Sequence, residues 1–180
     1  MEFTAAQDDM KRAYAGGSTG VLASGMVWTI AAITGLVQAP FASMLVLFFG
    51  GMLIFPLSVL LAKILGRSGR HASDNPLRFL AIETLAILFA GLLLAFYFAN
   101  IAHQYFYPIM LITIGIRYIV FQSLYGEKLY WVLGALLTVS GVASLLLNAP
   151  FIIGAFIGGG CELLFALMLL RKYKGNESLG

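Results

Sequence analysis

Hydrophobic residues run along the chain in six long, almost uninterrupted stretches that short polar segments separate. A helix rises about 1.5 Å per residue and bilayer hydrocarbon is about 30 Å thick, so about 20 apolar residues span it. The stretches are continuously apolar and lack the alternation of a membrane barrel, which favours helices. The pattern predicts six transmembrane helices, at Val21–Val37, Phe41–Leu65, Leu77–Ala99, Tyr107–Tyr125, Leu129–Leu147 and Phe151–Leu170.

Composition excludes a soluble domain of this size. Of the 180 residues, 61% are hydrophobic and only 11% are charged, and the mean hydropathy is +0.93. We therefore expect an all-α membrane protein, a bundle of six transmembrane helices arranged as three helical hairpins. Its parts would be an N-terminal segment over residues 1–19, a transmembrane domain over 20–171 and a tail over 172–180.

The basic residues predict the orientation. Of eleven Lys and Arg residues, all except Arg117 flank one face of the predicted bundle. Cytoplasmic loops carry the excess of Lys and Arg, so both termini of this multi-pass protein should be cytoplasmic. The flanking residues are Lys11, Arg12, Lys63, Arg67, Arg70, Arg78, Lys128, Arg171, Lys172 and Lys174.

The N-terminal segment does not have the form of a signal peptide, because it is acidic and lacks a basic region before a cleavage site. Phe3, Met10 and Tyr14 recur at helical spacing, which is consistent with an amphipathic helix on the membrane surface. A frayed polar tail is the equal alternative.

Two internal patterns concern helix packing. Residues from Ala39 and from Ala149 match at an offset of 110 residues, which indicates either parallel repeats or shared composition. Gly154 and Gly158 form a small-residue series that Glu162 continues. Small residues allow close approach of helices in lipid, so Glu162 should point at a neighbouring helix.

Three charged residues lie inside predicted spans: Glu83, Arg117 and Glu162. Counted from the inner ends of their helices, all three lie roughly 10 to 14 Å deep. A charge at the centre of a bilayer costs about 2.5 to 3.5 kcal/mol on insertion scales, so these side chains should meet one another. The sequence therefore predicts a Glu-Arg-Glu layer.

Two interpretations of this layer stay open. Two acids beside one arginine leave a surplus negative charge, so one carboxylate would bind a proton or cation, as in a centre for binding or transport of a small solute or ion. Alternatively the charges are a structural clasp in a non-catalytic membrane subunit or sensor. Hydroxyl ligands at comparable depth would be Thr29, Thr84 and Thr138.

Other chemistry is sparse. Arg67, Arg70 and His71 would contact lipid headgroup phosphates, unless they only satisfy the need for a basic inner loop. The lone Cys161 excludes an internal disulfide. We expect no metal, no cofactor and no nucleic-acid partner, and leave homo-oligomerisation open. A lipid-modifying enzyme is the third alternative. It ranks below the other two because the sequence shows no nucleophile with a neighbouring base.

Three stretches resemble a family of small bacterial inner-membrane proteins that is uncharacterised: Asp9–Gly17, Phe49–Lys63 and Gly66–His71. The resemblance covers most of the chain. It implies a six-helix bacterial membrane protein, and it implies no activity, substrate or catalytic residue.

Overall fold

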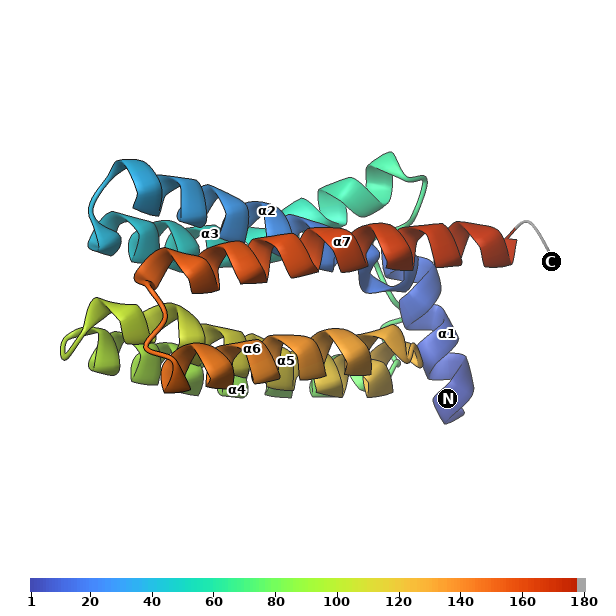
Figure 1. Cartoon of the computed structure of the whole chain (residues 1–180). Coiled ribbons are helices and arrows are strands. Elements are labelled where there is room, and N and C mark those ends of the chain that lie inside the picture. The colour runs from blue at the N-terminus through green and yellow to red at the C-terminus, as the bar shows by residue number, and fades with distance from the viewer. Residues whose placement is uncertain (178–180) are drawn as a thin grey trace.

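The computed structural model describes residues 1–177, with side chains as far as Tyr173, and this part of the chain is helical apart from its turns (Figure 1). Residues 178–180 of the predicted tail lie outside the described residues. The elements are α1 Phe3–Tyr14, η1 Ala15–Gly17, α2 Ser18–Val37, α3 Pro40–Ile64, α4 Leu77–Ala99, η2 His103–Tyr105, α5 Phe106–Tyr125, α6 Leu129–Leu146 and α7 Phe151–Glu177.

Within residues 1–177, six helical stretches are long and apolar enough to cross a bilayer, which confirms a multi-pass membrane protein. The first stretch, Phe3–Val37, includes α1, η1 and α2, and the others contain α3 to α7. The predicted bounds agree with these helices to within a few residues, except at the end of α7, which continues past the predicted Leu170 to Glu177.

The spans form two layers of three helices (Figure 1). Helix α2 packs against both α3 and α7, and α5 packs against both α4 and α6. The third predicted hairpin is therefore not a unit of the packing, because α6 and α7 lie in different layers and each contacts its layer neighbour far more extensively. The predicted grouping into three hairpins reflects the order of the helices along the chain, whereas the helices pack according to the two layers.

The two layers have related orders, α3–α2–α7 and α6–α5–α4. Exchanging α2 with α5, α3 with α6 and α4 with α7 turns one layer into the other. Exchanged helices run in opposite directions, because successive spans alternate. This is the order expected of two inverted three-helix units that swap their last helices. The exchange between layers relates α3 to α6, whereas the 110-residue offset in the sequence relates α3 to α7.

Glycines set the closest approaches within each layer. A Cβ atom on Gly134 of α6 would lie 2.6 Å from the carbonyl oxygen of Gly115 on α5. In the other layer, a Cβ atom on Gly25 of α2 would lie 2.9 Å from the backbone nitrogen of Leu163 on α7. These backbones pack in direct contact, as small residues permit between membrane helices.

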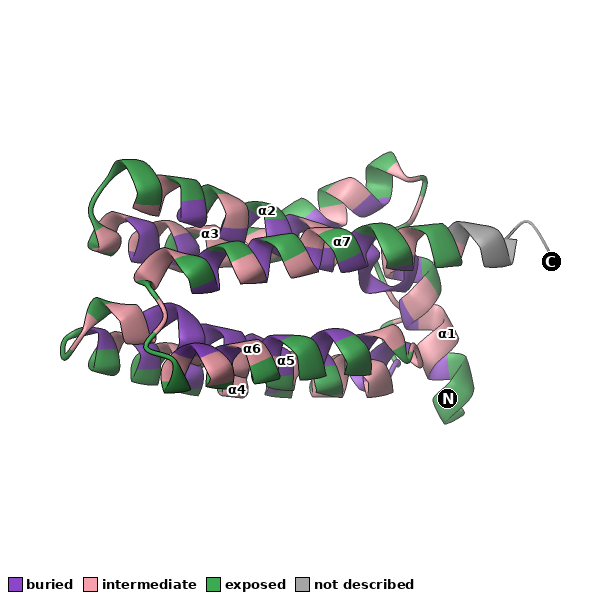
Figure 2. Cartoon of the chain, in the orientation of Figure 1, coloured by how far each residue is buried: buried purple, intermediate pink, exposed green. Residues whose placement is uncertain are grey.

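Burial follows the layers, with buried residues between the helices and exposed residues around the outside (Figure 2). The largest fully buried side chains include Trp28, Tyr107 and Tyr130. Large apolar side chains cover the exterior, among them Leu93 at 74% and Leu146 at 77% exposed. An apolar exterior of this extent is suited to lipid contact.

Helix α1 turns away from α2 and lies across one end of the bundle (Figure 1). The turn uses positive φ angles at Ala15, Gly16 and Gly17, of 50°, 65° and 78°. The Gln7 side chain donates to the Ser123 carbonyl, with Nε2 and O 2.8 Å apart, which ties α1 to α5. The segment is helical over Phe3–Tyr14, and its position on the membrane surface stays a prediction.

The same end of the bundle holds α1, the α3–α4 loop, the α5–α6 turn and the far end of α7 (Figure 1). These segments and the adjoining ends of α3 and α4 carry the ten flanking basic residues. The chain thus places its basic positions at one end of the bundle, here named the basic end. The assignment of this end to the cytoplasm stays a prediction.

Candidate functional site

Glu162 of α7 lies between the layers and has no exposed surface. The hydroxyl of Tyr118 on α5 donates to Glu162 Oε1, with the two oxygens 3.0 Å apart. Ser24 of α2 lies against both the Glu162 carboxyl and the Tyr118 hydroxyl. Three helices from both layers therefore meet at this carboxyl group, here named the Glu162 site.

Two polar atoms of this region have no hydrogen-bond partner in the described protein. They are Glu162 Oε2 and Arg117 Nε, and both are buried. The Arg117 charge acts on Glu162, but no direct ion pair joins them among the described residues, and the guanidinium lies 5.6 Å from the centre of the Phe121 ring. Buried polar atoms are normally paired, so these two atoms make this region the candidate site.

The glycine series explains why Glu162 faces inward. Gly154 packs against Tyr107, and Gly158 packs so closely on Trp28 that a Cβ atom would lie 2.3 Å from its ring. Glu162 follows one turn later on the same face of α7. The prediction that Glu162 points at a neighbouring helix is confirmed by its complete burial.

Glu83 is not part of the Glu162 site. Its side chain is exposed on α4, whereas the adjacent Thr84 is buried. Successive residues of a helix point about 100° apart, so a residue at the right depth still faces outward if the helix is rotated by one position. The predicted Glu-Arg-Glu layer is therefore wrong in its Glu83 member, and the described bond to Glu162 comes from the Tyr118 hydroxyl.

The predicted hydroxyl ligands are mostly bonded to their own helices. Thr29 Oγ1 donates to the Gly25 carbonyl at 2.7 Å, and Thr84 Oγ1 donates to the Ala81 carbonyl at 2.8 Å. Thr138 Oγ1 is buried without a hydrogen-bond partner in the described protein and packs against Gly115 on α5. Neither Thr29 nor Thr84 is needed to complete the Glu162 site.

The three residues predicted to contact lipid headgroups, Arg67, Arg70 and His71, do not all lie at one site. Arg67 lies over the Tyr173 ring, with its guanidinium carbon 4.9 Å from the ring centre. Arg70 and His71 instead line a groove of about 520 Å³ between α3 and α4, together with Arg78. This groove at the basic end is here named the loop groove.

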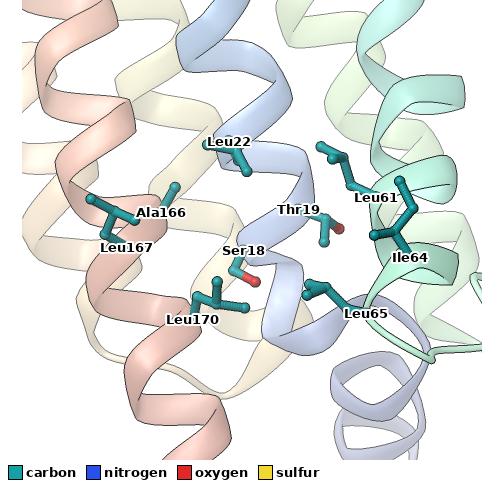
Figure 3. A pocket seen from close by; sticks show the side chains of 9 residues that line it. All are labelled: Ser18, Thr19, Leu22, Leu61, Ile64, Leu65, Ala166, Leu167 and Leu170. Carbon is teal, nitrogen blue, oxygen red and sulfur yellow. The ribbon is translucent and has the colours of Figure 1, made fainter.

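A second hollow, of about 100 Å³, lies between α2, α3 and α7 (Figure 3). Leu22, Leu61, Leu65, Leu167 and Leu170 contribute to its wall. Its two hydroxyl-bearing residues are bonded within the protein: Ser18 to the Ala15 carbonyl, and Thr19 to Ser58. The apolar wall suits a hydrocarbon chain and gives no polar site.

Tyr118 and Ser24 are the members of the Glu162 site that sequence reasoning missed. Tyr118 directly follows Arg117, and a phenol inside a span is a polar group that requires a partner. Ser24 belongs to the small-residue positions of α2. Both residues carry a hydroxyl group at the depth of a buried charge, and this is the feature of the sequence that could have identified them.

No curated protein and no solved structure matches this chain. A family model does match it, over residues 3–172, and so covers all six spans. The family's description gives no function, in agreement with the resemblance to an uncharacterised family. The chain belongs to DUF7010, a family of unknown function.

Proposed function

We propose that this membrane protein binds a small solute or ion at the Glu162 site and carries it across the bilayer. The observation that supports this best is a fully buried carboxyl group with one oxygen that lacks a hydrogen-bond partner, on which the charge of Arg117 acts; the buried Nε of Arg117 also lacks a partner. Ionisable residues inside membranes commonly mark substrate, ion or proton pathways.

The groups at the site suit a ligand with two kinds of polar contact. Glu162 Oε2 can accept a proton or the donor of a cationic group. Arg117 remains a cation at any ordinary pH and can bind an anionic group. Tyr118 and Ser24 supply hydroxyls that orient the carboxyl. A zwitterionic solute, or an anion that moves with a proton, matches this set.

The packing supports transport because the site lies between two layers of inverted order. Many transporters place their substrate between inverted repeats and expose it to each side by rocking one unit against the other. Helix α1 contacts helices of both layers at the basic end. Gln7 donates to the Ser123 carbonyl of α5, and Gly69 of the α3–α4 loop donates to the Ala13 carbonyl of α1. We infer that opening toward the basic end requires α1 to move.

The second candidate is a membrane subunit or sensor in which the site is only a clasp. The direct Tyr118–Glu162 hydrogen bond favours it, because this bond joins α5 of one layer to α7 of the other. Buried polar groups can fix which helices become neighbours. In that case the carboxyl would exchange nothing with solvent.

The proposal predicts a flux that depends on Glu162. Purified protein in liposomes with an entrapped pH-sensitive dye is given Na⁺, K⁺ or a panel of zwitterionic amino acids. We expect wild type to couple one of these additions to proton movement, and Glu162→Gln to abolish that response while the helices remain folded. Glu83→Gln is the matched control and should respond like wild type, because Glu83 is exposed and outside the site. Equal responses of wild type and Glu162→Gln would favour the clasp.

The proposed inner-membrane orientation predicts opposite labelling at the two ends. Ser68, in the α3–α4 loop, and His103, in η2, are both exposed and lie at opposite ends of the bundle. Each is replaced singly by cysteine in a Cys161→Ala background and treated with a membrane-impermeant thiol reagent in intact cells. We expect labelling at residue 103 and protection at residue 68, because the basic end should be cytoplasmic. The reverse pattern would contradict this orientation.

A further inference from the structure

The loop groove is held in shape by contacts between the α3–α4 loop and α1. Asp9 Oδ2 accepts hydrogen bonds from the Ala72 backbone nitrogen at 2.9 Å and from Asn75 Nδ2 at 2.8 Å. The Gly69 nitrogen donates to the Ala13 carbonyl at 3.1 Å. These bonds tie the backbone of the loop to α1 at Gly69 and Ala72.

Three basic side chains line the groove. Arg70 is exposed. His71 is half-buried, with its ring edge against Tyr14 at 6.1 Å between ring centres. Arg78, at the start of α4, is half-buried, lies over the Phe79 ring at 4.7 Å and donates to a loop carbonyl. No carboxylate belongs to the described lining, so the groove is suited to an anion.

The other wall of the groove is apolar and belongs to α3. Phe55 is 67% exposed, and Val59 lies one turn further toward the loop. Helices α3 and α4 are in different layers and make few direct contacts within the described chain. The groove thus combines a cationic rim at the basic end with an apolar wall that continues along a membrane-spanning helix.

We propose that the loop groove binds one anionic phospholipid, with its phosphate at Arg70, His71 and Arg78 and an acyl chain along Phe55 and Val59. The planar guanidinium donors of arginine are well matched to phosphate oxygens. Basic pockets between transmembrane helices at the cytoplasmic side are known to bind phosphate headgroups. The apolar wall distinguishes a lipid from free phosphate, which has no group to contact it. Because α3 and α4 belong to different layers, the bound lipid would bridge the layers independently of the Glu162 site.

The test uses the full chain, purified in neutral detergent. Thermal unfolding is measured against increasing phosphatidylglycerol, phosphatidylcholine or inorganic phosphate. We expect phosphatidylglycerol to raise Tm at lower concentrations than phosphatidylcholine, and inorganic phosphate to have little effect. Arg70→Gln/Arg78→Gln should weaken the phosphatidylglycerol effect by about fivefold for each arginine. Lys128→Gln, an exposed change at the same end but outside the groove, should keep the wild-type response.

Arg78 bonds the loop and could affect folding, so Arg70→Gln alone provides a second variant on an exposed side chain. It should fold like wild type and lose about fivefold in apparent phosphatidylglycerol affinity. Equal stabilisation by the two lipids, or an unchanged response of Arg70→Gln, would overturn the proposal. Stabilisation by inorganic phosphate equal to that by phosphatidylglycerol would overturn the lipid in favour of a free anion.

Discussion

Replacing Gly134 with alanine is expected to destabilise the bundle by about 3 kcal/mol, the upper part of the range for overpacked cores. The added methyl would lie 2.6 Å from the Gly115 carbonyl oxygen and 2.9 Å from the Ile119 nitrogen. Both are backbone atoms of α5, so the clash can be relieved only by moving α5 and α6 apart. Thermal unfolding of the purified protein in detergent measures the loss.

Gly51→Ala is the matched control. Gly51 lies within α3, and a Cβ atom there would meet nothing within 4 Å. Alanine favours a helix by about 1 kcal/mol over glycine, so this variant should be unchanged or slightly more stable. If Gly134→Ala and Gly51→Ala unfold alike, α5 and α6 do not pack as closely as described.

Replacing Tyr118 with phenylalanine should destabilise the protein by about 2 kcal/mol and disturb any flux that depends on Glu162. The change keeps the ring, which stacks on Tyr130 with 6.0 Å between ring centres, and removes the hydroxyl that donates to Glu162 Oε1. A fully buried carboxyl oxygen would then lose its hydrogen-bond donor. Unfolding and liposome flux, measured on the same preparation, separate the effect on stability from the effect on function.

Tyr125→Phe provides the comparison. Tyr125 is buried in the same aromatic group, with its ring stacked on Tyr130 at 5.5 Å, and it has no side-chain hydrogen bond among the described contacts. We expect this variant to lose much less stability and to keep the wild-type flux. Equal effects of the two changes would mean that the Tyr118 hydroxyl does not matter to Glu162.

Helix positions could be predicted from the sequence because lipid leaves few alternatives. A segment in hydrocarbon must satisfy its backbone internally, so each apolar stretch becomes a helix whose ends lie near polar residues and prolines. Leu77–Ala99 is predicted and observed with the same bounds, and Phe41–Leu65 differs from α3 by one residue at each end.

The rotation of each helix could not be predicted in this way. Both faces of α4 are apolar, so nothing in its pattern tells that Thr84 is buried while Glu83 is exposed. Nor could the layers be predicted from connectivity. The short turn between α6 and α7 suggests a hairpin, yet α7 packs mainly on α2, and the Glu162 site joins residues 44 positions apart. These features depend on side-chain packing between distant helices.

The most direct test asks whether the Glu162 carboxyl exchanges a proton or a bound ligand with solvent. Infrared difference spectra of the purified protein in lipid, recorded on stepping the pH and on adding Na⁺, K⁺ or amino acids, report the carboxyl stretching band. We predict a band that changes in wild type and in Glu83→Gln and is absent from Glu162→Gln. If the spectra of wild type and Glu162→Gln are the same under all these conditions, the carboxyl is closed to solvent and the transport proposal is contradicted.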